Sequence, residues 1–129
     1  MKPFTALTSL AAAALLGLTA LVAPNAFAHG DAKPKHGGIV QSASDLSFEL
    51  VTQADGAALY VTDHGQPLVP TGMSGKLTVL VGEAKTDAEL KVVGDKLEAK
   101  GVKLASGAKV VASVTTAKSK VVVVRFTVK

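Results

Sequence analysis

The side chains in this sequence that are best suited to hold a metal ion are those of its three histidines, His29, His36 and His64. Imidazole nitrogens are common ligands of copper, zinc and nickel. His29 directly follows Ala28, where the N-terminal segment ends in a sequence typical of a signal-peptidase site. Cleavage after Ala28 would give His29 a free α-amine beside its imidazole ring. Together the two nitrogens form a chelating pair for copper or a similar cation.

Residues 1–28 have the pattern of a cleaved secretory signal peptide. Lys2 is the only charged residue among them, and Ala26 and Ala28 place small side chains before the cleavage point. The alternative is an uncleaved membrane anchor, which needs about 20 strongly apolar residues. Residues 6–22 suit an anchor poorly, because they are rich in alanine and include threonine, serine and glycine. We therefore expect export to the periplasm and no membrane insertion after cleavage.

Further candidate ligands accompany the histidines. Asp31 and Asp63 offer carboxylate oxygens, and Met73 offers a thioether, which suits Cu(I). For Met73 we favour packing in a loop or at a sheet edge. For His64 a ligand role competes with turn chemistry, because turns select residues such as the neighbouring Asp63 and Gly65 for their backbone preferences.

Composition argues against several classes of function. The formal net charge is only +4, the lysines are spread along the chain, and Arg125 is the single arginine. Nucleic-acid-binding proteins cluster their basic residues, so nucleic acid is not an expected partner. The chain has no cysteine, which excludes disulfides and thiolate ligands. It also lacks a Gly-X-Ser-X-Gly elbow, a phosphate-binding glycine loop and a His-Glu-X-X-His motif, so we do not expect an enzyme.

The elements that position these residues are predicted to be strands. Residues 29–38 are polar and contain glycine and proline, which favours a flexible arm. In residues 39–129, short runs of alternating apolar residues recur about every 8–12 residues between turn residues. This pattern predicts a single all-β domain with about seven strands, either an antiparallel β-sandwich of the Ig-like kind or a small barrel.

Three places in this domain carry more specific expectations. Asp55-Gly56 lies between two alternating runs and predicts a hairpin turn. Leu68–Val69 lies between two prolines and can be no more than an edge strand, because proline has no N–H for the ladder. Val121–Val124 is apolar on both faces, which favours a central strand that is covered on both sides or capped by a loop.

Three segments carry a resemblance to known proteins: His36-Gly37-Gly38-Ile39-Val40, residues 46–51 and residues 55–68. They contain a His-Gly-Gly opening, a Glu-Leu-Val strand and an Asp-x-Gly-x-Pro turn. Together they resemble small exported proteins found with bacterial heavy-metal resistance systems, and the β-rich N-terminal domain of membrane-fusion adaptors of metal-exporting efflux pumps. A terminal histidine on a small β-sandwich is also similar to CopC-type periplasmic copper carriers, although this chain lacks their Met-rich loop.

The resemblance implies a periplasmic metal-binding protein, a carrier or buffer that acts beside a heavy-metal resistance or efflux system. The expected ion is Cu(II) or Zn(II), held by His29 and His36, with His64 as a weaker third ligand. We expect metal affinity to fall as the pH is lowered, because protons compete for the imidazole nitrogens. The alternative is a non-catalytic interaction module whose sheet edge near Leu68–Val69 pairs with an efflux-pump adaptor or an envelope protein.

Overall fold

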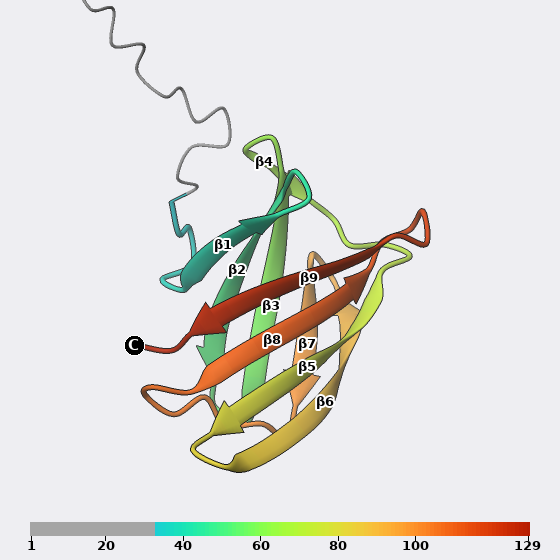
Figure 1. The fold of residues 1–129 in the computed structure, drawn as a ribbon. Helices are drawn as coiled ribbons and strands as arrows, with labels where there is room; N and C mark the ends of the chain where they lie inside the picture. The colour runs from blue at the N-terminus through green and yellow to red at the C-terminus, as the bar shows by residue number, and fades with distance from the viewer. Residues whose placement is uncertain (1–32) are drawn as a thin grey trace, which may run out of the picture.

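Nine antiparallel strands make up the part of the chain that the structure, a computed structural model, describes: residues 33–129 (Figure 1). In chain order they are β1 (Ile39–Ala43), β2 (Leu46–Gln53), β3 (Gly56–Asp63), β4 (Gln66–Leu68), β5 (Ser74–Val81), β6 (Ala84–Val93), β7 (Lys96–Lys100), β8 (Lys109–Thr115) and β9 (Val121–Thr127). Within these residues there is no helix, and so none that is long and apolar enough to cross a membrane. The all-β prediction is confirmed, with nine strands where the spacing of turns indicates about seven.

The strands form one sheet that curls until its two ends approach each other. Neighbouring strands follow the order β1-β2-β3-β7-β6-β5-β8-β9, and the short β4 pairs with β3 beside this path. The end strands β1 and β9 lie side by side without being paired to each other (Figure 1). The sheet is therefore a nearly closed barrel with one open seam, and the small barrel is the better description of the two architectures that the sequence favours.

Alternation along the strands separates a packed interior from a polar outside. In β5, Leu77 and Val79 point inward and are buried, whereas Thr78 faces outward and donates a hydrogen bond to Oδ1 of Asp87 at 2.7 Å. Phe48 fills the interior from β2 with no exposed surface. Burial of such a side chain stabilises the fold by about 1.5–3 kcal/mol. Since the chain has no cysteine, packing and strand pairing hold the domain together.

The predicted hairpin is present, and the observed edge strand overlaps the predicted one only at Leu68. β2 ends at Gln53 and β3 begins at Gly56, so the turn that contains Asp55 closes a hairpin. β4 pairs only with β3 and is an edge strand. Val69, which follows β4, is 56 % exposed. The open side of β4 is consistent with its central proline, which has no N–H to donate.

The prediction of a central strand at Val121–Val124 is wrong. β9 lies at one end of the sheet and pairs only with β8. Val122 and Val124 face the interior and are 2 and 3 % exposed, whereas Val121 and Val123 are 59 and 43 % exposed. A run of valines conceals this alternation, because β-branched residues suit an extended strand on either face.

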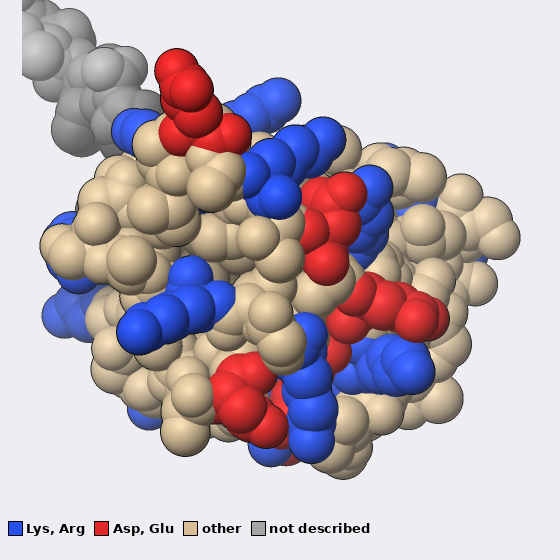
Figure 2. All heavy atoms as spheres, turned by 90° about the horizontal axis from the view of Figure 1, so that it is seen from below, with Lys and Arg blue, Asp and Glu red and all other residues tan. Residues whose placement is uncertain are grey.

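Charged side chains on the outside are not segregated by sign. Figure 2 shows lysines and acidic residues interspersed over one face of the molecule. Lys76 of β5 and Asp87 of β6 form such a pair, with 3.2 Å between Nζ and Oδ2. Exposed ion pairs contribute little to stability. Exposed charges of this kind do not mark a functional site, so we look for one among the polar side chains that are buried.

Candidate functional site

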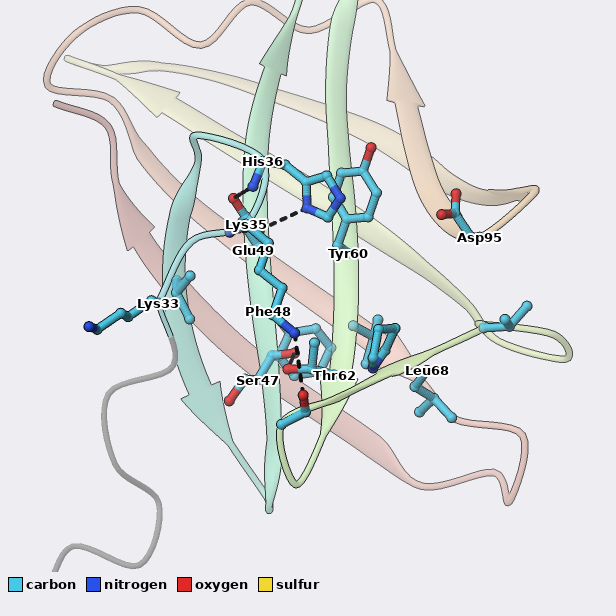
Figure 3. Close-up of a pocket in the computed structure, with 15 residues that line it drawn as sticks. Lys33, Lys35, His36, Ser47, Phe48, Glu49, Tyr60, Thr62, Leu68 and Asp95 are labelled. Atoms are coloured by element: carbon cyan, nitrogen blue, oxygen red, sulfur yellow. Dashed lines mark hydrogen bonds and ion pairs between the residues drawn. The ribbon is translucent and has the colours of Figure 1, made fainter.

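Glu49 is the only buried charged residue among residues 33–129. It lies in the middle of β2 with its side chain on the outer face of the sheet, yet only 6 % of the residue is exposed. The segment that precedes β1, residues 33–38, crosses this face and covers the carboxylate (Figure 3). We call this segment the strap. A buried carboxylate is unfavourable unless it is hydrogen-bonded, so the strap is the natural place to find its partners.

Four donors of the strap converge on the carboxylate of Glu49. Oε1 accepts a hydrogen bond from the backbone N–H of Lys35 at 3.0 Å. Oε2 accepts from the backbone N–H groups of His36 and Gly38, both at 2.8 Å. Nδ1 of His36 lies 3.0 Å from Oε1. The sequence favours a flexible arm here, and the structure differs in the described part of that arm, because these bonds anchor the strap to β2.

The two glycines after His36 allow the strap to approach the sheet this closely. Gly37 has a φ of +74°, in the left-handed region that glycine adopts without steric penalty. A Cβ atom on Gly38 would lie 2.3 Å from the carbonyl oxygen of Leu50, which is too close for any side chain. The His-Gly-Gly sequence is therefore a steric requirement of the strap, and it sets the position of His36 on the sheet.

Tyr60 holds the imidazole of His36 from a second direction. Tyr60 in β3 is the register partner of Glu49 in β2, so their side chains leave the outer face next to each other. The rings of His36 and Tyr60 are stacked, with 3.6 Å between centroids and 5° between planes. Nζ of Lys96 lies 5.9 Å from the centroid of the Tyr60 ring. The carboxylate and the aromatic ring together fix the orientation of the imidazole.

The hydrogen bonds of the strap keep Glu49 ionised. Burial disfavours the charged carboxylate and by itself would raise its pKa. The N–H of Gly38, the side chain of His36 and the remaining N–H groups of the strap act in the opposite direction, and the net effect lowers the pKa of Glu49 below its ordinary value. The carboxylate that faces the imidazole is therefore negatively charged at neutral pH.

This arrangement leaves one nitrogen of His36 available to a ligand. Because an ionised carboxylate can only accept hydrogen bonds, we assign the proton facing Glu49 to Nδ1. Nε2 has no partner within the described part of the chain, and the His36 side chain is 42 % exposed. Metal-binding histidines commonly donate their other N–H to a carboxylate or a backbone carbonyl in this manner. His36 and Glu49 therefore have the arrangement expected of a metal-ligating histidine and the carboxylate that supports it.

The structure does not bring His64 into one cluster with His36. His64 lies in the turn between β3 and β4 with a φ of +49°, and its Nδ1 is 2.5 Å from Oδ1 of Asp63. Residues 33–129 contain no group of three His, Cys, Asp or Glu side chains that could hold a metal ion. Within those residues, His36 and His64 belong to two separate pairs.

The remaining candidate ligands lie elsewhere. Met73 is 9 % exposed and packs in the hydrophobic core, so its thioether has a packing role. His29 and Asp31 lie outside the described residues, and their part in a metal site stays a prediction.

Glu49 and Tyr60 belong to this site, although neither is among the ligands that the sequence predicts. Glu49 lies between Phe48 and Leu50 in an apolar strand, and an acidic residue in that setting needs a partner if it is buried. That pattern could have identified it. Tyr60 lies next to Glu49 because β2 pairs with β3 in one particular register. The predicted hairpin implies that the two strands pair, but it does not fix that register.

A pocket of about 340 Å³ lies beside the His36–Glu49 pair (Figure 3). It is bounded by the strap, by the outer face of β2 and β3, and by β4.

Comparison with known proteins gives no relative for this chain, since no family model, curated protein or solved structure matches it.

Proposed function

We propose that this protein is an exported, periplasmic metal-binding protein that carries or buffers Cu(II) or Zn(II) beside a heavy-metal resistance or efflux system. The observation that supports metal binding most directly is the His36–Glu49 pair. A buried, ionised carboxylate orients the ring through Nδ1, and Nε2 remains as a ligand atom. The association with a resistance system rests on the sequence resemblance of the His-Gly-Gly, Glu-Leu-Val and Asp-x-Gly-x-Pro segments.

One imidazole does not make a metal site, so other ligands must join Nε2 of His36. Cleavage after Ala28 would make the amine and the ring of His29 available. His29 precedes His36 by seven residues, and a chain of that length spans up to about 25 Å. The new N-terminus can therefore return to the strap. Three nitrogens and one oxygen ligand, from water or Asp31, would give a four-coordinate site that suits either ion.

His64 enters this proposal as the weaker third histidine. The ammonium of Lys35 in the strap donates to the carbonyl oxygen of Gly65 at 3.3 Å. Gly65 follows His64 in the turn between β3 and β4, so the strap and this turn are neighbours. A rotation of the exposed His64 side chain toward the strap would break only its contact with Asp63.

Calorimetric titration with Cu(II) and with Zn(II) tests this function. The protein is purified from the periplasm of an expressing host, and mass spectrometry establishes its first residue. We expect His29→Ala and His36→Ala each to weaken binding by more than tenfold, and Glu49→Gln, which alters only the supporting residue, by about tenfold. Lys118→Ala, in the exposed turn before β9, is the control and leaves affinity unchanged. Unchanged affinity in both histidine variants would remove the proposal.

A second candidate function, an interaction module, is favoured by the exposed edge at β4. β4 pairs on one side only, and Val69 beside it is 56 % exposed. An efflux-pump adaptor or envelope protein could add a strand to that edge. This function predicts that such a partner still co-purifies when His29, His36 and His64 are all replaced by alanine, and that Val69→Asp abolishes its capture. The metal-binding function predicts neither result.

A further inference from the structure

The pocket between the strap and β4 has the size of a small-molecule site. Its volume of about 340 Å³ is near the lower end of the range for ligand pockets, roughly 300–1,000 Å³. Lys35 and His36 of the strap line one side of it, and Ser47 and Thr62, which are register partners in β2 and β3, lie in the sheet beneath (Figure 3). Occupation of this pocket by a small molecule is independent of metal binding at His36.

Lys33 also lines this pocket but points away from its centre in Figure 3, so Lys35 is the cation that a ligand there would meet. Its ammonium donates to the carbonyl oxygen of Gly65 at 3.3 Å and forms no ion pair with a carboxylate of residues 33–129. Glu49 also lines the pocket, but its carboxylate is already engaged by four donors. Figure 3 shows Asp95 beyond Tyr60, away from the strap. An anion is therefore the ligand that complements the free charge.

The wall opposite the strap is apolar. It is formed by Pro67 and Leu68 of β4 and by Val69, which is 56 % exposed. Val40 of β1 adds a further apolar side chain to the lining. A cation next to exposed hydrocarbon surface favours a ligand that carries a negative group at one end and an apolar chain at the other.

We propose that this pocket binds a small monocarboxylate with a short aliphatic chain. The carboxylate accepts a hydrogen bond from the ammonium of Lys35 in place of the Gly65 carbonyl. The chain packs against Leu68 and Val69, where it removes apolar surface from water. Thr62 can turn its hydroxyl toward the ligand, because its present hydrogen bond to a backbone carbonyl of β2 is long, 3.5 Å.

NMR titration of the purified, metal-free protein tests this proposal with three ligands of the same length. Hexanoate carries the expected charge, hexanamide is its neutral analogue, and hexylamine carries the opposite charge. We expect hexanoate to shift the amide resonances of Lys35, Thr62 and Leu68 saturably. Hexanamide should bind about tenfold more weakly, the effect of losing one charge-assisted hydrogen bond, and hexylamine should not bind. Equal affinity for hexanoate and hexanamide would overturn the proposal.

Two substitutions of Lys35 separate the charge from the fold. Lys35→Met keeps the hydrocarbon stem and the backbone N–H that bonds Glu49, so the strap stays in place while hexanoate affinity falls about tenfold. Lys35→Glu reverses the preference from hexanoate to hexylamine, a change that a purely structural role would not produce. The matched control Lys118→Met leaves hexanoate binding unchanged. Retention of full hexanoate affinity in Lys35→Met, or an equal loss in Lys118→Met, would contradict the assignment.

Discussion

The imidazole of His36 lies flat against the phenol ring of Tyr60, with 3.6 Å between the ring centroids. In the same position its Nδ1 lies 3.0 Å from the carboxylate of Glu49. The two supporting residues are register partners on β2 and β3, so one pair of adjacent strands provides both contacts. A ligand atom that is oriented before binding loses less conformational entropy when it binds, which increases affinity.

Replacement of Tyr60 tests the contribution of the stacked ring. We expect Tyr60→Leu to lower the free energy of unfolding by about 0.5–1.5 kcal/mol through loss of the aromatic pair, as measured by urea denaturation. Tyr60→Phe is the matched variant, because it keeps the ring and removes only the hydroxyl. The ring-current shifts of the His36 side-chain protons should persist with phenylalanine and disappear with leucine. Identical His36 resonances in the two variants would contradict the stacked geometry.

Replacement of Glu49 by glutamine is expected to loosen the strap. The glutamine amide has one acceptor oxygen, and its NH₂ group would face donors, so at least one of the four donors loses its acceptor. Hydrogen bonds to a charged group contribute about 1.5–3 kcal/mol, and we expect a loss of that order in local stability. Hydrogen exchange at Lys35, His36 and Gly38 measures it. Glu89→Gln, an exposed change, is the control, and equal protection of these amides in both variants would refute the prediction.

Acidification is expected to weaken the strap through the same carboxylate. The pKa of Glu49 is lowered in the folded protein: burial opposes ionisation, but the hydrogen bonds from the strap outweigh it. A carboxylate whose folded pKa lies below its unfolded pKa contributes stability above the unfolded value and loses it as the pH falls through the folded value. The difference in strap protection between wild type and Glu49→Gln should therefore be constant near neutral pH and shrink below about pH 4.5.

Asp87 provides the control for this pH dependence. Its pKa is also lowered, first by the hydrogen bond from Thr78 and then by Lys76, but it lies on the exposed face of β6. At each pH, the amides of the strap should exchange at the same rates in Asp87→Asn as in wild type. A strap whose protection in wild type does not change between pH 5 and 3 would show that Glu49 is not what anchors it.

The all-β fold could be predicted because turn residues and alternation are local properties. Asp55-Gly56 marks a hairpin, although its turn is Ala54-Asp55 and Gly56 is the first residue of β3. The prolines around Leu68–Val69 limit that segment to an edge in any sheet. The same local information fails for Val121–Val124, because four valines in a row have no polar member to mark the outward face. Which of these valines face the interior depends on the side of β9 that the curled sheet encloses, and that is a long-range property.

The candidate site was predicted only in part. The chemistry of its side chain marks His36 as a candidate ligand, and the glycines that follow it appear in the sequence only as part of a flexible arm and of the His-Gly-Gly opening. The partners of His36 depend on which strand passes beneath the strap. Glu49 is 13 residues from His36 in the sequence, and nothing in that separation indicates that the two side chains meet. His64 shows the converse limitation: its residue type suits a ligand, but nothing in its sequence indicates that the turn pairs it with Asp63 and leaves it apart from His36. Residue type thus indicates the chemistry available, whereas strand pairing decides which groups meet.

Threonine substitutions in β9 test whether only one face of this strand is buried. Val124 faces the interior with 3 % exposure, so Val124→Thr buries a hydroxyl among apolar side chains and should lower the free energy of unfolding by about 1–3 kcal/mol. Val123 is 43 % exposed on the other face, and Val123→Thr should change that free energy by no more than about 0.5 kcal/mol. Urea denaturation of the two single variants measures both values. A strand covered on both faces would be destabilised by either substitution, so similar losses would contradict the burial of only one face of β9.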